Sequence, residues 1–257
     1  MRAAAERITS LAERALATRG EFAWALAGGK TPEELYRLLA GAPHAARIDW
    51  TRVHFFWSDE RCVPADHADS NYRMARESLL DRVRPPEAHV HRMQGELPPL
   101  LEASRYEREL AAVVPAAVVP AASFPAANFL ADGAASTPSS PPPRLDLILL
   151  GMGADGHTAS LFPGAAAVSE RQRWVTATRI EGREVARLTF TLPLINAAAA
   201  VLFLVAGADK APALARVMAH EPQPTEGAPH EALPAQLVRP ATGELEWLVD
   251  AQAAALL

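Results

Sequence analysis

The apolar residues of this chain form short continuous runs that alternate with longer segments of helical periodicity. Short runs bounded by turn residues are typical of strands buried on both faces of a sheet. The predicted strands are residues 21–27, 52–57, 87–93, 145–150, 173–178, 185–192, 199–206 and 246–249. The predicted helices are residues 1–20, 32–40, 71–83, 100–113 and 209–220. This alternation predicts an α/β fold, a doubly wound and mainly parallel central sheet with helices on both faces.

One segment interrupts the alternation. Residues 115–143 are rich in proline, alanine and serine and end in three consecutive prolines. Such a composition does not build a packed core, so we expect a surface excursion. The strand at 145–150 needs the first half of the sheet to pack against, and we expect the pair 173–178 and 185–192 beside it. The excursion therefore joins elements of a single domain, residues 1–257, and does not separate two domains.

Composition narrows the class of protein. The net charge of −5 and the pI of about 5.9 argue against a nucleic-acid or anionic-membrane partner. The first twenty residues lack the apolar core of a signal peptide, and no apolar run approaches the ~20 residues of a membrane span. A single cysteine, Cys62, excludes an internal disulfide framework. We expect a cytoplasmic protein, either a monomer or a weak homo-oligomer.

The strand at 145–150 ends at a glycine-rich loop with the sequence GMGADGHTASLFP. In an open α/β sheet, ligands bind beyond the carboxyl ends of the strands. Glycines such as Gly153 let the main chain approach a ligand closely, and a histidine with a pKa of about 6.5 suits a general base. We therefore expect His157 to be catalytic and Asp155 to orient its imidazole. A loop-bracing role for His157 is the alternative.

The loop also spells G-x-G-x-x-G, the pattern of dinucleotide-binding sites. Pro163 and Gly164 would break the long helix which that site requires, so a nucleotide cofactor is not expected. His89 and His91 alternate on a predicted strand without a carboxylate or cysteine at ligand spacing. We predict that they are structural and that the protein holds no metal.

A pair of glycines follows the first predicted strand and opens the sequence Gly28, Gly29, Lys30, Thr31 and Pro32. Thr31 is the expected N-cap and Pro32 the expected first helical residue. Unpaired N–H groups and the helix dipole favour a phosphate at such a turn, and Lys30 adds a positive charge. An ordinary tight turn is the alternative.

Three ionisable residues follow the strand at 52–57: Asp59, Glu60 and Arg61. Arg61 could hold an anionic group through two hydrogen bonds, while Asp59 or Glu60 could orient a sugar hydroxyl or brace the arginine. A surface salt-bridge cluster is the alternative.

Two further cations stand at strand ends. Of the 25 basic residues only Lys30 and Lys210 are lysines, and both follow predicted strands. Arg187 opens the run RLTFTL within the predicted strand at 185–192. Together with Arg61, these cations could converge on one anion.

Five segments follow one another along the chain: GGKTP, FFWSDERCVP followed by SNYRM, LGMGADGHTASLFP, RLTFTLPLIN and AGADK. In this order they resemble the motifs of 6-phosphogluconolactonases. The resemblance runs from about residue 27 to about residue 210. These enzymes belong to the phosphosugar isomerase-like superfamily, which also contains glucosamine-6-phosphate deaminases. The resemblance implies a Rossmann-like phosphosugar isomerase-type fold. It also implies hydrolysis of 6-phospho-D-glucono-1,5-lactone to 6-phosphogluconate in the oxidative pentose phosphate pathway, without metal or cofactor.

The resemblance also assigns roles. His157 matches the catalytic histidine, Arg61 the substrate-binding arginine, and residues 28–31 the glycine-rich turn. Arg187 and Lys210 match basic positions near the phosphate. The expected mechanism has His157 take a proton from the attacking water and return it to the ring oxygen, while N–H groups of the glycine loop or Arg61 stabilise the oxyanion.

Two departures from the pattern matter. Ala27 and Lys30 stand where the family often has serine. In the deaminases the histidine block continues into Asn-Glu-Pro, which contains a catalytic carboxylate, whereas residues 160–163 here contain no acid. The lactonase is therefore expected, with a deaminase and a non-catalytic sugar-phosphate-binding protein as the alternatives.

Overall fold

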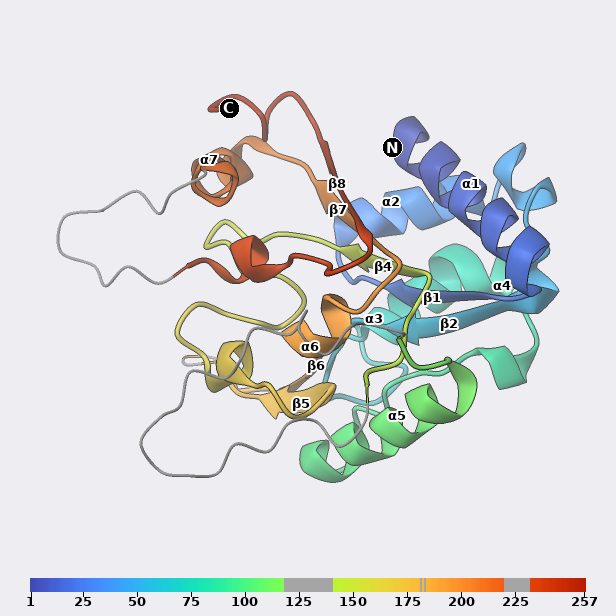
Figure 1. Ribbon diagram of the computed structural model, residues 1–257, viewed down its shortest axis with the longest axis horizontal. Helices are drawn as coiled ribbons and strands as arrows, with labels where there is room; N and C mark the ends of the chain where they lie inside the picture. The colour runs from blue at the N-terminus through green and yellow to red at the C-terminus, as the bar shows by residue number, and fades with distance from the viewer. Residues whose placement is uncertain (118–140, 181, 183, 220–231) are drawn as a thin grey trace, which may run out of the picture.

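The computed structural model describes residues 1–117, 141–180, 182, 184–219 and 232–257 (Figure 1). Most of the predicted 115–143 excursion lies outside these residues. Its two ends are described, and they pair: the N–H of Ala117 donates to the carbonyl of Pro142 at 2.8 Å, and that of Arg144 to Pro115 at 2.8 Å. The chain therefore leaves and re-enters the fold at one place.

A five-stranded sheet in the order β2-β1-β4-β7-β8 forms the centre of the molecule, and every neighbouring pair in it is parallel. Its strands are β1 Phe22–Leu26, β2 Val53–Trp57, β4 Leu147–Leu150, β7 Ala200–Val205 and β8 Glu244–Val249. The continuous apolar runs are explained by burial on both faces: in β4, Leu147 and Leu149 enter one core cluster, and Ile148 and Leu150 enter the other. The predicted α/β class and mainly parallel sheet are confirmed.

Helices cover both faces of this sheet (Figure 1). Residues of the first group share one core cluster, and those of the second group share the other. The first group is α1 Arg2–Arg19, α2 Lys30–Leu39, α3 Asn71–Ala75, its π-helical continuation Arg76–Leu80 and α4 Asp81–Val83. The second group is α5 Pro99–Val113, α6 Leu192–Ile195 and α7 Ala211–Met218. Short 3₁₀ helices are His44–Ala46, Trp50–Arg52, Glu87–His89, Ala166–Ser169, Ala208–Lys210 and Pro234–Leu237.

A second, antiparallel sheet has the order β3-β6-β5. Its strands are β3 Asp59–Arg61, β6 Arg187–Phe190 and β5 Val175–Thr178. The pairing of the two predicted strands is confirmed, but their expected position beside β4 is wrong. Both edges of β4 are already occupied by β1 and β7, so the pair recruits the short charged segment after β2 instead.

Two other expectations need correction. Residues 87–93 do not form a strand: a 3₁₀ turn precedes a single bridge between Val90 and Phe55. Pro85 and Pro86, which lack N–H groups, stand directly before this segment and limit the ladder. Helix α2 begins at Lys30, two residues before the predicted start, with Gly29 and not Thr31 as its N-cap.

In the described part of the chain, no helix combines the length and the apolar character that a membrane span requires.

Candidate active site

The carboxyl ends of β1, β4 and β7 share one edge of the sheet because these strands are parallel neighbours. The Gly28 turn follows β1, the His157 loop follows β4, and Lys210 follows β7. From β1 the chain goes to β2 on one side, and from β4 it goes to β7 on the other. Such a reversal in strand order opens a crevice in which ligands bind.

His157 and Asp155 are in direct contact. The imidazole Nδ1 lies 2.5 Å from Asp155 Oδ1, and the main-chain N–H of His157 donates to the same oxygen at 3.1 Å. Since a carboxylate accepts hydrogen bonds, Nδ1 is the donor in this contact, and in the neutral imidazole Nε2 then carries the lone pair. The ring also stacks on Phe162, with centroids 4.1 Å apart. The imidazole is thereby oriented with one nitrogen ready to accept a proton.

Asp155 remains ionised in this arrangement. Burial opposes its charge, but the hydrogen bonds from the main chain and the imidazole of His157 act in the opposite direction, and the pKa of Asp155 lies below its usual value.

Gly153 makes room for the imidazole. A Cβ at this position would lie 2.0 Å from His157 Nδ1. Its N–H donates to the carbonyl of His157 at 2.9 Å, which closes the loop. Within the fold, Gly153 therefore shapes the loop, and its own N–H is already engaged.

The turn after β1 requires glycine at two positions. Gly29 has a φ of +104°, in the region that side chains disfavour, and it caps α2. A Cβ on Gly28 would lie 1.9 Å from Oδ1 of Asn71. Lys30 and Thr31 form the first turn of α2 and so lie at its positive end.

Asp59 and Glu60 point into the protein. Their residues are only 6% and 2% exposed. Glu60 accepts hydrogen bonds from the N–H groups of Arg61, Asn71 and Tyr72 at 2.7–2.8 Å and from the hydroxyl of Ser70 at 3.0 Å. Burial raises the pKa of Glu60, while these main-chain hydrogen bonds act in the opposite direction. Glu60 thus caps the start of α3.

Arg61 lies beside these carboxylates, half-buried. One of its terminal nitrogens donates to the carbonyl of Asp69. Its buried Nε has no hydrogen-bond partner among the described residues. A buried donor without a partner is uncommon, and a bound ligand is one way to satisfy it.

Arg187 is joined to both the Asp59 segment and the histidine loop. Its Nη1 lies 3.5 Å from Ser160 Oγ and 3.9 Å from Asp59 Oδ2. The guanidinium carbon lies 5.8 Å from the centroid of Phe162, the ring that stacks on His157. The fold therefore brings four predicted site residues into one contact network: His157, Asp155, Asp59 and Arg187.

Lys30 and Lys210 lie on the same edge of the sheet but outside that network. Lys210 pairs with Asp209 at 2.9 Å, and no described hydrogen bond or ion pair joins either lysine to the other predicted site residues. Their part in ligand binding stays a prediction.

The sequence interpretation overlooked Asn71 and Ser160. Both are buried polar residues whose side chains contact Asp59. A signal for each existed, since Asn71 starts the helix in the SNYRM segment and Ser160 follows the histidine in HTASLFP.

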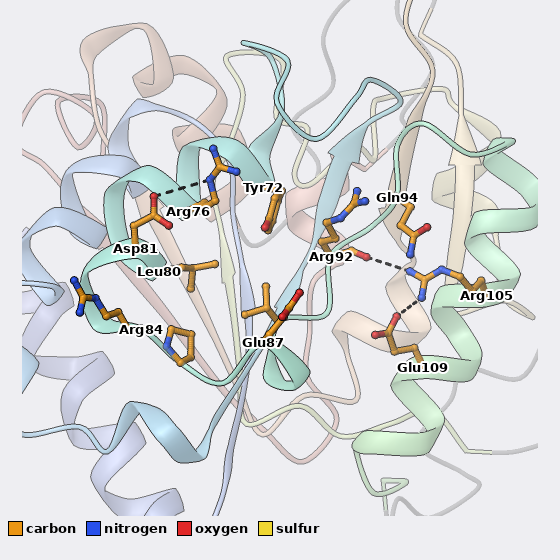
Figure 2. Close-up of a pocket in the computed structure, with 12 residues that line it drawn as sticks. Tyr72, Arg76, Leu80, Asp81, Arg84, Glu87, Arg92, Gln94, Arg105 and Glu109 are labelled. Atoms are coloured by element: carbon orange, nitrogen blue, oxygen red, sulfur yellow. Dashed lines mark hydrogen bonds and ion pairs between the residues drawn. The ribbon is translucent and has the colours of Figure 1, made fainter.

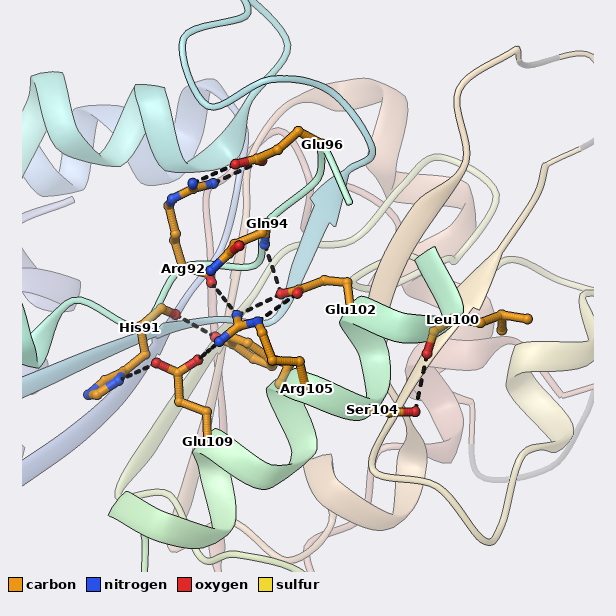
Figure 3. A network of polar contacts seen from close by, with 10 residues as sticks. His91, Arg92, Gln94, Glu96, Leu100, Glu102, Ser104, Arg105 and Glu109 are labelled. Carbon is orange, nitrogen blue, oxygen red and sulfur yellow. Dashed lines mark hydrogen bonds and ion pairs between the residues drawn. The ribbon is translucent and has the colours of Figure 1, made fainter. Parts of the chain in front are cut away.

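A separate hollow of about 680 Å³ lies against α3, α4 and α5 (Figure 2). Three of the four arginines that line it pair with carboxylates: Arg105 with Glu109, Arg92 with Glu96 at 2.6 Å, and Arg76 with Asp81 at 4.0 Å. Arg105 also donates hydrogen bonds to Glu102 from Nε and Nη2, both at 2.7 Å. Figure 3 shows this pairing. None of the predicted site residues lines this hollow, so it is separate from the strand-end crevice.

The predicted structural histidines belong to the same region. His91 Nδ1 lies 2.9 Å from Glu109 Oε1, its Nε2 lies 3.0 Å from His54 Nδ1, and the His89 ring stacks on His54 (Figure 3 shows the first contact). No group of three or more histidine, cysteine or acidic side chains suited to a metal occurs within the described ranges.

Comparison with known proteins places nearly the whole chain in one group. The sequence model described as glucosamine-6-phosphate isomerases/6-phosphogluconolactonase matches residues 1–247. A 6-phosphogluconolactonase of Synechocystis sp. is 43% identical over 247 residues, which are 96% of this chain and 89% of the relative. A 6-phosphogluconolactonase of Nostoc sp. is 40% identical over 95% of this chain and 88% of the relative.

Solved structures agree. The 6-phosphogluconolactonase from Trypanosoma brucei superposes with a TM-score of 0.80 at 30% identity, covering 99% of this chain and 93% of that one. A monomeric glucosamine-6-phosphate deaminase superposes with a TM-score of 0.68 at 20% identity, covering 98% and 97%. At that identity the second likeness concerns the fold alone.

Proposed function

This chain belongs to the glucosamine-6-phosphate isomerase/6-phosphogluconolactonase family, and we propose that it hydrolyses 6-phospho-D-glucono-1,5-lactone to 6-phosphogluconate in the oxidative pentose phosphate pathway. The relatives named as lactonases support this reaction. The observation that carries the mechanism is the 2.5 Å contact between His157 Nδ1 and Asp155, beyond the carboxyl end of β4.

In this mechanism His157 is the general base. Its Nε2 takes a proton from a water molecule while the water oxygen attacks the lactone carbonyl carbon. The bond between that carbon and the ring oxygen then breaks, and His157 returns the proton to the departing ring oxygen. Asp155 accepts a hydrogen bond from Nδ1–H throughout the reaction. This contact stabilises the imidazolium that exists after His157 has taken the proton from water and before it gives the proton to the ring oxygen.

Arg61 is the residue that we assign to the developing oxyanion. Its Nε is buried and has no hydrogen-bond partner among the described residues, so a ligand oxygen would satisfy it. The N–H of Gly153 is bound to the carbonyl of His157, which argues against Gly153 as an oxyanion donor. Preorganised donors of this kind are often the largest contribution to catalysis.

The phosphate is assigned to the cations and N–H groups around the crevice. The Gly28–Gly29 turn directs the positive end of α2 at this edge, and Arg187 is already in contact with the histidine loop through Phe162. Lys30 and Lys210 are the remaining candidates. Because phosphate contacts are made in both the ground state and the transition state, Arg187→Ala or Lys210→Ala should mainly raise KM. If KM stays unchanged in both variants, the phosphate lies elsewhere.

The deciding experiment removes the base. A positioned general base supplies a rate factor of about 10² to 10⁴, so we expect His157→Ala to lower kcat by that order while KM changes little. The lactone also hydrolyses spontaneously, and its decay is therefore compared for wild-type protein, the variant and no protein. His89→Ala, near the amino end of β2, is the matched control and should retain wild-type turnover. Near-normal turnover of His157→Ala would eliminate the assignment.

A parallel assay addresses the deaminase alternative. Residues 160–163 supply no carboxylate for ring opening and amine protonation. We expect no ammonia release from glucosamine 6-phosphate under conditions in which the lactone is hydrolysed.

A further inference from the structure

We propose that Asp59 is a positioning residue that fixes the histidine loop and the glycine turn relative to each other, acting through Ser160 and Asn71 without touching the substrate. This inference rests on the proposed lactonase function, because it concerns the same site.

Asp59 occupies a junction between three segments. It is the first residue of β3, pairs with Thr189 of β6, and is only 6% exposed. Its Oδ2 accepts a hydrogen bond from Ser160 Oγ at 2.6 Å, and its Oδ1 accepts one from Asn71 Nδ2 at 3.2 Å. Both carboxylate oxygens are therefore used inside the protein, and little of the side chain remains for a sugar hydroxyl.

Ser160 transmits this contact to His157. Ser160 lies in a tight turn that is closed by the N–H of Leu161 donating to the carbonyl of Thr158 at 2.9 Å. Its own N–H donates to Thr189 Oγ1 at 3.1 Å, so main chain and side chain are both held by the second sheet. Thr158 in turn donates to the carbonyl of Gly151 at 2.9 Å, at the start of the loop. A shift of Ser160 would therefore move the residue next to His157.

Asn71 transmits the contact to the glycine turn. Its Nδ2 also donates to the carbonyl of Asp59 at 2.9 Å, which fixes the orientation of the amide. Its Oδ1 lies 1.9 Å from the place where a Cβ on Gly28 would be. The amide thus packs directly against the Gly28 main chain, and Asp59 determines where the amide lies.

The same carboxylate also places a charge beside Arg187. Arg187 Nη1 lies 3.9 Å from Asp59 Oδ2, and the two side chains are only 12% and 9% exposed. Buried charges interact more strongly than exposed ones, because water screens them less. One buried carboxylate therefore fixes the relative positions of the base, the glycine turn and a cation. A displacement of about 1 Å between such groups can lower the rate roughly 10²-fold.

Three variants separate the two arms of this arrangement, which are the hydrogen bond from Ser160 to Asp59 and the hydrogen bond from Asn71 to Asp59. Ser160→Ala removes the hydrogen bond to the histidine loop, and we expect kcat to fall roughly 10-fold or more with KM nearly unchanged. Asn71→Ala breaks the arm to the glycine turn, and we expect KM to rise several-fold with a smaller change in kcat. Asp59→Asn keeps the side-chain shape and weakens both arms, so both constants should change. In the double variant Asp59→Asn/Ser160→Ala the effects on kcat should not add, because the two residues act through one hydrogen bond.

Asp146→Asn is the matched control. Asp146 is also a largely buried aspartate with a main-chain hydrogen bond, from the N–H of Ala23 at 2.9 Å, and an ion pair with Arg19. It precedes β4 and so lies at the amino edge, away from the crevice. We expect this variant to lose stability but to keep wild-type kcat and KM.

The outcomes are distinguishable. If the wild-type protein does not hydrolyse the lactone, the proposed function fails. If the wild type is active and Asp59→Asn is impaired while Ser160→Ala and Asn71→Ala are normal, Asp59 touches the substrate and the positioning role is wrong. Normal constants in all three variants would also overturn it. Should Asp59→Asn not fold, the Ser160→Ala and Asn71→Ala measurements decide alone.

Discussion

At the residue scale, the packing of single atoms explains why glycine occupies position 28. A methyl group there would collide with the side-chain amide of Asn71. Two hydrogen bonds hold Asn71 in place: its amide donates to the carbonyl of Asp59, and its main-chain N–H donates to Glu60. The amide therefore has little freedom to move away.

We predict that Gly28→Ala is destabilising by about 1–3 kcal/mol, the usual cost of overpacking. The variant should also raise KM because the turn is displaced. Gly41→Ala is the control at the other end of α2: its Cβ would meet only ordinary contacts, 3.5 Å or more away, and its stability should be equal or slightly higher. Thermal unfolding and lactone kinetics measure both effects. Equal unfolding temperatures for the two variants would contradict the steric argument.

The site was predictable only in part at this scale. His157 and Asp155 lie two residues apart on a loop after a buried strand, so local sequence was sufficient to join them. Asn71 and Ser160 are single polar residues in different segments, and only the folded chain brings them to Asp59. The inward direction of Asp59 and Glu60 had no local signal either, because a short charged segment usually faces solvent.

At the element scale, the junction between β3 and α3 depends on Glu60. The first N–H groups of a helix have no partner within it, and the Glu60 carboxylate accepts two of them, from Asn71 and Tyr72. This junction also bears Arg61, so its stability affects the site.

We predict that Glu60→Ala lowers the free energy of unfolding by at least about 2 kcal/mol, since several buried donors lose their acceptor. Glu170→Ala is the comparison: Glu170 also accepts two main-chain hydrogen bonds, from Gln172 at 2.6 Å and Arg173 at 3.1 Å, but in a more exposed loop. Water can replace that acceptor, and we expect a loss below about 1 kcal/mol. Urea unfolding compares the two. A larger loss in Glu170→Ala would show that burial does not decide the effect.

Sequence patterns predicted the elements of the central sheet better than those around it. Strands β1, β4 and β7 are marked by long apolar runs because both of their faces are buried. Strand β3 has three charged residues and depends on pairing with β6, a tertiary contact without a local pattern. The segment 87–93 has strand-like alternation, but the alternating residues are His89 and His91, which take part in a polar cluster.

At the scale of the whole molecule, the two sheets contribute different parts of the site. The parallel sheet is anchored by core clusters on both faces and delivers three loops to one edge. The antiparallel sheet supplies Asp59, Thr189 and Arg187, whose contacts hold the histidine loop against that edge. The histidine loop is thus attached to both sheets and not to one.

The histidine cluster at the edge strand β2 makes the stability of the whole molecule depend on pH. His54 is largely buried, stacks on His89 at 3.9 Å, and lies 3.9 Å from Glu21 through Nε2. Burial, followed by the charges of His89 and His91, lowers the pKa of His54 from 6.5 to about 4. Between these values the unfolded chain binds a proton that the folded protein does not, so the free energy of unfolding must fall as the pH falls.

We predict that this group costs roughly 2 kcal/mol of stability between about pH 6.5 and about pH 4, after allowance for partial screening by water. His54→Phe retains a ring in the buried strand and removes the titration, so its stability should depend less steeply on pH than that of the wild type. Urea unfolding of both proteins at several pH values gives the difference, in which the carboxylates common to both cancel. Parallel curves would mean that His54 is protonated as easily in the folded protein as in the unfolded chain, and that burial at this edge does not restrict its charge.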